Sequence, residues 1–409
     1  MRLRQWINGY LVVIGRLCNV LLVVAAGYAF SDTITHHWRW KQVETFVLAT
    51  VGDWEIVNRI EPVMPGNPNR GYSHLPEKRW IKIHQQQRSD PVQFKRQPHG
   101  GSAFDSKRGR LVLFGSDTHG EDWSNVVRIF DMSSVKWIPT AQPDDYQGYV
   151  VDSAGEPSAR ADVKRPWAMH TFDAVDYDPV NDQLMVASHP DHLKPDRFGQ
   201  WMAASWGEIK KHPTWFYHFR DNSWSTGEGK AVSFFPYSIA YDSKRQRFVG
   251  FRPDGVFQYA GARGWQRIAK KGINAYHTNA VYDPRNDAFI ILGTHTSSNA
   301  VYLFRNGDRG ALEQPTPGLR PPGMESVPAA FHPGVGKTVV LVDSPVGEKG
   351  GAQTWLYDIA EDRWEQIDEA VFPFKLGMNY NMQYDPIHNQ LVLVAGGHED
   401  FTSVWVLRL

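Results

Sequence analysis

One short motif recurs six times along this chain and limits its possible folds more than any other feature. An aromatic residue is followed by Asp, or once by His, and often by Pro, at Phe104-Asp105, Tyr177-Asp178-Pro179, Tyr241-Asp242, Tyr282-Asp283-Pro284, Phe331-His332-Pro333 and Tyr384-Asp385-Pro386. Six positions after the Asp or His stand Leu111, Leu184, Phe248, Phe289, Thr338 and Leu391, five of which are apolar. A turn of constant length between two β-rich runs predicts a hairpin, in which Asp caps the turn and Pro presets φ.

Each predicted hairpin continues into further β-rich runs. A third run follows at Val126–Phe130, Trp215–Phe219, Gly255–Tyr259, Ala300–Phe304, Thr354–Tyr357 and Ser403–Leu407. After several of these come a turn and a Trp that fits a fourth, outer strand, at Trp137, Trp224, Trp265 and Trp364. Four antiparallel strands repeated six times predict an all-β, six-bladed β-propeller. The repeated Trp residues are interpreted as packing residues.

The last blade lacks its own fourth strand, because the sequence stops at Leu409, soon after the third run. The segment Lys78–Ile83 has the right Trp-containing form. We therefore expect an N-terminal strand at about residues 78–84 to pair with Ser403–Leu409, which removes two free sheet edges.

The two blocks 384–397 and 355–364 resemble kelch repeats, as found in kelch and galactose-oxidase-like propellers. The resemblance covers about Lys78 to Leu409 and implies an architecture, but it does not imply a particular function. The double Gly of the family is intact only at Gly396-Gly397, so the repeats are divergent; other residues replace the second Gly at Ser116, Ser188, Arg252, Thr294 and Asp343.

The N-terminus carries a targeting or anchoring segment. Two arginines among the first four residues precede Tyr10–Phe30, which is apolar except for Arg16 and Asn19. Twenty-one residues are long enough to span a bilayer. The positive flank then predicts a single-pass, signal-anchor helix in the bacterial inner membrane, with the propeller on the periplasmic side. In the alternative, Leu17–Ala29 is the core of a signal peptide that is cleaved after Ala29.

Three parts are therefore predicted: an anchor at 1–30, a juxtamembrane segment and linker at 31–77, and the propeller at 78–409. Within the second part, Trp38–Val47 fits either a short amphipathic helix at the membrane surface or a stalk that packs on the propeller. Pro62–Pro76 contains four Pro and favours an extended linker.

Composition excludes several classes of function. Lys+Arg and Asp+Glu number 44 each, so no global charge favours nucleic acid as a partner. The only Cys is Cys18, inside the predicted anchor, which excludes a Cys nucleophile, a Cys-based zinc site and the Tyr–Cys copper site of galactose oxidase from the propeller.

Candidate site residues were sought where a propeller places its pocket. The loop into strand one and the loop from strand two to strand three lie on the same face and near the axis. Before the first strands stand His99, His170, Tyr237, His277, Ser326 and Asn379-Tyr380. After the second strands stand His119, His189 and His192, Arg252, His295, Asp343 and His398-Glu399-Asp400.

The imidazoles at these positions favour acid–base chemistry, metal binding or hydrogen bonding to a polar ligand. His99, His170, His277, Tyr237 and Arg252 are the catalytic candidates. The other His residues named in these loops, with Asn379, are candidates for ligand binding. A structural interpretation stands beside this one, because a His before a strand often caps a neighbouring carbonyl. No metal site is assigned and no cofactor is identified, since neither His189-x-x-His192 nor His398-Glu399-Asp400 has a specific spacing.

Two long inserts, Ala141–Met169 and Pro190–Thr214, fall on the predicted pocket face, and their aromatic content favours ordered lids.

The function we favour is a non-catalytic binding or scaffold subunit of a membrane-associated assembly, with protein partners on a propeller face. A polysaccharide lyase that uses pocket His, Tyr and Arg is the alternative. A sensor of a soluble ligand or metal is the third possibility.

Overall fold

A computed structural model describes the propeller region of the chain. The described residues are 71–87, 90–94, 99–118, 122–190, 203–275, 277–293, 299–314, 317–323, 327–343, 351–373, 375–376, 380–396 and 402–409. The predicted anchor at 1–30 and the segment 31–70 lie outside them. Within these ranges, no helix has the length and apolar character needed to cross a membrane.

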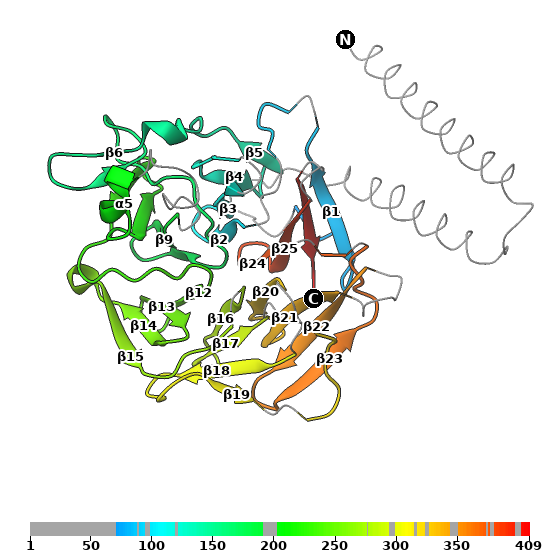
Figure 1. Ribbon diagram of the computed structural model, residues 1–409. Coiled ribbons are helices and arrows are strands. Elements are labelled where there is room, and N and C mark those ends of the chain that lie inside the picture. Colours follow the sequence, from blue (N-terminus) through cyan, green and yellow to red (C-terminus); the bar gives the residue numbers. More distant parts are fainter. Residues whose placement is uncertain are drawn as a thin grey trace, which may run out of the picture. The chain divides into compact units, whose positions relative to one another are not determined.

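The described residues form six four-stranded antiparallel sheets. Figure 1 shows these sheets arranged as the blades of a ring, with strands such as β12, β16, β20 and β24 innermost. This arrangement confirms the predicted all-β, six-bladed propeller. In each of the first five blades, the strands follow one another outward in chain order.

The first three blades occupy the first half of the ring. Blade one has β2 (Gly101–Asp105), β3 (Arg110–Phe114), β4 (Arg128–Asp131) and β5 (Lys136–Ile138). Blade two has β8 (Val175–Asp178), β9 (Gln183–Ala187), β10 (Thr214–His218) and β11 (Ser223–Thr226). Blade three has β12 (Ser238–Asp242), β13 (Arg247–Arg252), β14 (Gly255–Tyr259) and β15 (Trp265–Ala269).

The other three blades complete the ring. Blade four has β16 (Asn279–Asp283), β17 (Ala288–Leu292), β18 (Val301–Arg305) and β19 (Leu312–Gln314). Blade five has β20 (Ala329–His332), β21 (Lys337–Asp343), β22 (Ala352–Asp358) and β23 (Arg363–Ile367). Blade six has β24 (Asn381–Asp385), β25 (Gln390–Ala395), β26 (Ser403–Leu407) and β1 (Trp80–Gln85).

The hairpin turns explain the recurring sequence motif. In blade two, Asp178 Oδ1 accepts hydrogen bonds from the backbone N–H groups of Val180 and Asn181, at 2.8 and 3.2 Å. The hydroxyl of Tyr177 then donates to Asp182, which closes the turn with a left-handed φ of 56°. Asp and Asn tolerate this conformation better than other side chains with a Cβ. The same Tyr-to-Asp/Asn contact, five residues apart, recurs at Tyr217, Tyr282, Tyr357 and Tyr384.

Blade six closes the ring as predicted. β1 pairs antiparallel with β26, with Trp80 opposite Leu407 and Ile81 opposite Val406. The indole Nε1 of Trp80 donates to Thr354 Oγ1 of blade five at 2.9 Å. Trp265 makes the equivalent bond from blade three to Thr214 of blade two, also at 2.9 Å. In blades six and three, the outer Trp therefore joins the blade to the preceding one.

The predicted packing role of the other outer Trp residues agrees with their burial. Trp137, Trp224 and Trp364 are 5%, 8% and 2% exposed. Blade four has no such Trp, and its outer strand β19 spans only three residues.

The first insert, residues 141–169, is ordered and holds a two-stranded sheet of β6 (Val150–Val151) and β7 (Pro157–Ser158). Helix α5 (Ala203–Ile209) belongs to the second insert, whose residues 191–202 lie outside the described part. Trp167 and Ile209 bring the two inserts into the core shared by blades one and two.

The described end of the linker, residues 71–77, packs on the propeller. Tyr72 is 1% exposed, and its hydroxyl donates to the carbonyl of Met132 at 2.6 Å. Its ring also meets His388 edge to face, with centroids 4.7 Å apart. These contacts attach the chain to blades one and six before β1 begins.

Candidate functional site

The two faces of the ring differ in the loops they carry. The turn face is defined here by the six hairpin turns between strands one and two of each blade. The pocket face is the opposite one, with the loops that enter strand one and those that follow strand two. His99 and His170 lie on this pocket face, just before blades one and two begin.

The structure brings His99 and His170 together. Their rings stack with centroids 4.1 Å apart and planes inclined by 19°. Asp117, just after β3, lies beside both, with its Oδ1 3.6 Å from Nε2 of His99 and 3.8 Å from Nε2 of His170. One potential ligand atom from each of the three side chains lies within 4.8 Å of the others. Two imidazoles and a carboxylate from two blades thus converge on one point.

Glycines allow the two blades to approach closely here. A Cβ on Gly101 would lie 2.3 Å from the carbonyl oxygen of Phe172. Gly115 has a φ of +119°, and a Cβ on it would lie 2.4 Å from Thr171 Oγ1. Real Cβ atoms are not found at such distances, so only glycine fits these positions without a shift of the backbone.

Hydrogen bonds of Thr171 and of the His99 carbonyl then hold the two blades together at this point. The hydroxyl of Thr171 accepts from the N–H of Gly101 and donates to the carbonyl of Phe114, both at 2.8 Å. The carbonyl of His99 accepts from the N–H groups of Thr171 and Phe172, each at 3.0 Å. The backbones that carry the two His residues are therefore joined directly.

The site is polar but largely shielded from solvent. The side chains of His99, Asp117 and His170 are 14%, 5% and 0% exposed. Thr118 Oγ1 lies 3.2 Å from Nε2 of His170, and Ser188 Oγ donates to the His170 carbonyl at 2.7 Å. Of the three side chains, His99 retains the most exposed surface.

Aromatic residues extend the group toward blades three and four. Phe172 stacks on His277 with centroids 4.5 Å apart and planes inclined by 20°. Phe235 contacts both His170 and Phe172, at 6.1 and 5.4 Å between centroids. Phe172 and His277 have left-handed φ values of 47° and 62°. Such a conformation is uncommon for large side chains.

Tyr237 and Arg252, the candidates from blade three, are held by local contacts. Arg252 Nε donates to the carboxylate of Asp254 at 2.9 Å, and its Nη1 donates to the carbonyl of Ser233. The ring of Tyr237 packs against the core between blades two and three. His189 contacts Trp206 of α5, with centroids 5.9 Å apart. The contacts of these residues place them in the surrounding loops of the face.

The remaining candidates lie outside the described residues, so their roles stay predictions: His119, His192, His295, His398 and Asn379.

Sequence reasoning missed three residues of this group: Asp117, Phe172 and Phe235. Asp117 occupies the searched position directly after strand two, and the focus on His119 two residues later passed over it. The two Phe residues follow the same rule, because both precede strand one of their blades. A search for any polar or aromatic residue at these positions would have found all three.

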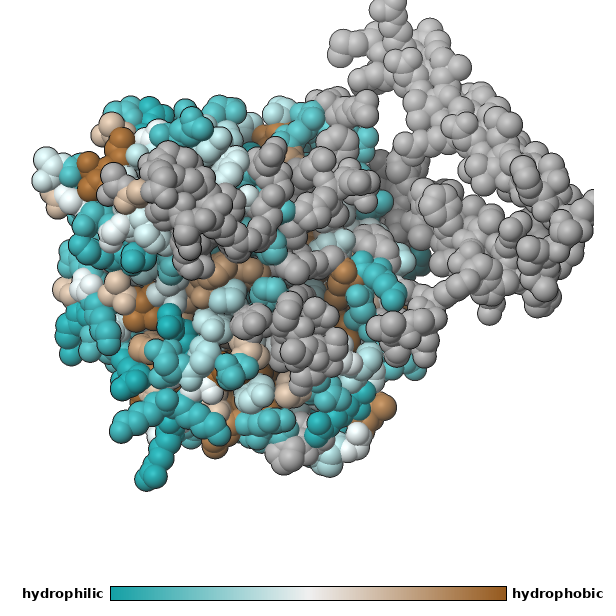
Figure 2. Space-filling model, viewed as in Figure 1, coloured by the Kyte–Doolittle hydropathy of each residue, from teal (hydrophilic) through white to brown (hydrophobic). Residues whose placement is uncertain are grey.

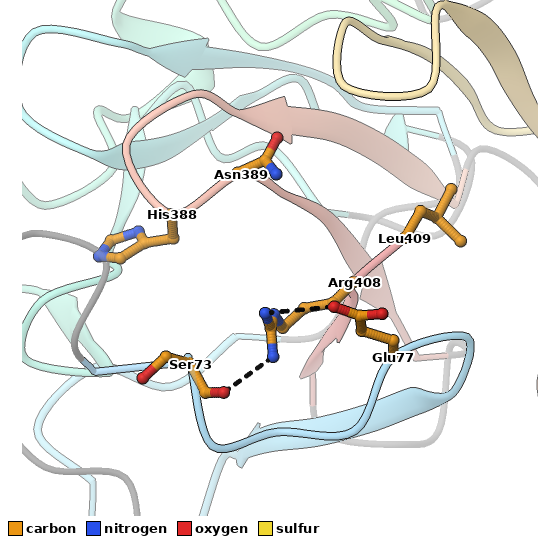
Figure 3. Close-up of a pocket in the computed structure, with 6 residues that line it drawn as sticks. All are labelled: Ser73, Glu77, His388, Asn389, Arg408 and Leu409. Atoms are coloured by element: carbon orange, nitrogen blue, oxygen red, sulfur yellow. Dashed lines mark hydrogen bonds and ion pairs between the residues drawn. The ribbon is translucent and has the colours of Figure 1, made fainter.

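A hollow of about 240 Å³ lies on the turn face beside blade six. In Figure 3, Arg408 is directed toward Ser73 and Glu77, while the ring of His388 points away from them. Arg408 donates to the carbonyls of Ser73 and Leu75 at 3.0 and 2.6 Å, and Nδ1 of His388 lies 2.5 Å from buried Asp385. These interactions are internal and attach the linker to the last blade.

The view in Figure 2 is mostly hydrophilic, and its hydrophobic residues are scattered among polar ones.

Comparisons with known proteins give no family assignment: no protein-family model matches the chain, and no curated protein matches its sequence.

Proposed function

We propose that this chain is a membrane-anchored, extracytoplasmic propeller of the kelch type that binds a polar ligand or partner on its pocket face. It would serve as a binding subunit of a membrane-associated assembly. One observation carries the proposal: His99, Asp117 and His170 converge from two blades of a closed ring, at the face where propellers present their loops. A rigid scaffold that holds polar groups at one point is suited to recognition.

The proposed location is supported by the sequence. The apolar stretch Tyr10–Phe30, flanked by N-terminal arginines, has the length and charge pattern of a signal anchor. Kelch membership is supported by the blocks at 355–364 and 384–397.

The contacts of Arg252 favour binding over lyase chemistry. A uronate lyase of the type considered above needs an Arg to neutralise the carboxylate and a His or Tyr to remove the α-proton. Arg252 is engaged by Asp254 and by the Ser233 carbonyl. A lyase-like enzyme remains the second candidate, because a carboxylate beside two imidazoles is an arrangement that supports proton transfer.

Three experiments test the proposal. In spheroplasts, protease should cut the chain after Phe30, and in inverted vesicles the same region should be protected. The reverse pattern would contradict the location.

A photo-reactive residue at Trp123, on the pocket face, should cross-link a membrane component, whereas one at Lys244, on the turn face, should not. Cleavage of uronate polymers by the purified chain, lost in His99→Asn, would instead establish the enzyme.

A further inference from the structure

We propose that His99, Asp117 and His170 together bind one divalent transition-metal ion of the zinc class. The inference rests on the proposed function only in that it uses the same face. Metal binding is measured without any partner, so the two proposals can fail separately.

The donor set fits this class of ion. Two imidazole nitrogens and one carboxylate oxygen are ligands for zinc and similar transition metals, whereas Mg²⁺ and Ca²⁺ prefer oxygen ligands alone. Three protein ligands also leave an open coordination position, which is the usual arrangement where a metal contacts a ligand or substrate. The exposed side of His99 provides the direction of approach.

The distances are close to those that an ion requires. Metal–ligand bonds of about 2.0–2.1 Å in a tetrahedral site place ligand atoms roughly 3.4 Å apart. Asp117 Oδ1 lies 3.6 and 3.8 Å from the two Nε2 atoms. A contraction of a few tenths of an ångström therefore suffices between the carboxylate and each imidazole. Separations of this size are too long for hydrogen bonds.

One ring must rotate for both imidazoles to reach the same ion. Each nitrogen lone pair lies in its ring plane, and the two planes are stacked with centroids 4.1 Å apart and inclined by only 19°, so one ion cannot lie in both planes. The χ2 torsion of His is broad, and rotation about it costs little. His170 is fully buried and close to Thr118, so we expect His99 to rotate. Binding should thus break the His99–His170 stack.

The supporting contacts make this a constructed site. The His99 carbonyl is held by two N–H groups of blade two, and the His170 carbonyl is held by Ser188. These bonds fix the backbone from which the two imidazoles project. Because imidazole must be neutral to bind a metal, affinity should fall as the pH is lowered.

The test uses the full chain, purified in detergent and treated with a chelator. Co²⁺ is titrated and followed by its visible absorption, which reports coordination geometry, and Zn²⁺ is then added as a competitor. We expect one equivalent of Co²⁺ per chain, displaced by Zn²⁺ but not by Mg²⁺ or Ca²⁺. His99→Asn and Asp117→Asn should each weaken binding at least about tenfold. His74→Asn, at an exposed His of the segment 71–77, is the control and should change nothing.

His170 is left unchanged, because its side chain is fully buried and its replacement would disturb the fold. Thermal unfolding of each variant is recorded in parallel to show that it is folded. Asp117→Asn preserves side-chain volume and His99→Asn shortens a partly exposed side chain, and these two variants carry the test. No Co²⁺ binding by the wild type, or binding that survives both substitutions in folded protein, would overturn the inference. Face-specific cross-linking without metal binding would leave the proposed function standing.

Discussion

The turn face and the pocket face both collect charged side chains, but they organise them differently. On the turn face, Arg108 of blade one donates to Asp105 at 2.9 Å and to both oxygens of Asp182 of blade two at 2.7 and 2.6 Å. Arg245 repeats the arrangement between blades three and four, with Asp242 and Asp287. On the pocket face, Asp117 lies 3.6 and 3.8 Å from two imidazole nitrogens.

The difference separates structural from functional clusters of charge. The carboxylates of the turn face have short, bidentate, repeated contacts, which are among the strongest in proteins and join adjacent blades. Among the described residues, the group on the pocket face occurs once and has longer separations. Composition alone does not distinguish the two kinds of cluster, but the distances of the contacts and their repetition between blades do.

The largest expected effect comes from breaking the scaffold on which both faces depend. Trp80→Ala removes a buried side chain and its bond to Thr354, and should destabilise the protein by about 3–5 kcal/mol. Trp265→Ala, at the equivalent position of blade three, should cost a similar amount. Chemical denaturation measures both. If Trp80→Ala costs less than half as much as Trp265→Ala, the ring is not closed by β1 as firmly as the other blades are joined.

Arg108→Ala tests the turn face alone. It leaves Asp105 buried beside Asp182 without the guanidinium, and we expect a loss of about 2–3 kcal/mol at pH 7. The hydrogen bonds from Arg108 lower the pKa of Asp182 to about 2, so its share of stability is present above about pH 4 and lost as the pH falls toward 2. Denaturation curves of variant and wild type should therefore converge in acid.

Arg245→Ala is the matched variant and should lose a similar amount of stability, because Arg245 contacts Asp242 and Asp287 in the same geometry. Neither substitution should alter Co²⁺ binding. A change in metal affinity in either variant would contradict the separation of the two faces.

The hairpins and the ring closure could be predicted from the sequence because their determinants are local. Asp178 caps a turn only two and three residues away, and the fixed spacing to Leu184 follows from that turn. β1 was recognised by its Trp, since a blade without an outer strand needs one from elsewhere in the chain.

The site could be predicted only in part, because its geometry depends on contacts between blades. The loop positions of His99 and His170 could be read from the repeats, but their stacking requires Gly101 and Gly115 to lie against residues of blade two. The selection of His119 in place of Asp117 shows the same limit. Equivalent positions in a repeat identify a face, and only the packing of neighbouring blades determines which side chains on it meet.

A smaller effect is expected from Asp176, on β8 between the two faces. Its carboxylate accepts N–H groups of Tyr177 and of Tyr241 in blade three, both at 2.7 Å. Burial raises the pKa of Asp176 to about 6 in spite of these donors. A raised carboxyl pKa means that the folded protein binds the proton more tightly, so stability should fall as the pH rises from about 4 to 6.

Asp176→Asn should remove this slope, which we estimate at about 1–3 kcal/mol over that range. Comparing the slopes avoids the separate effect of Asn on the two hydrogen bonds. An unchanged slope in the variant would show that other groups cause the pH dependence.

The smallest effect on stability is expected at the pocket face itself. His99→Asn removes an imidazole that is 14% exposed, but it leaves the backbone carbonyl bonded to Thr171 and Phe172. Because those two bonds, and not the ring, join the blades, we expect a loss of no more than about 1 kcal/mol in metal-free protein. With Zn²⁺ present, the wild type alone should gain stability, since an ion that binds only the folded state stabilises it by mass action. Melting temperatures with and without Zn²⁺ measure this. A large loss of stability in metal-free His99→Asn would make the stack structural, and the pocket face would then resemble the turn face after all.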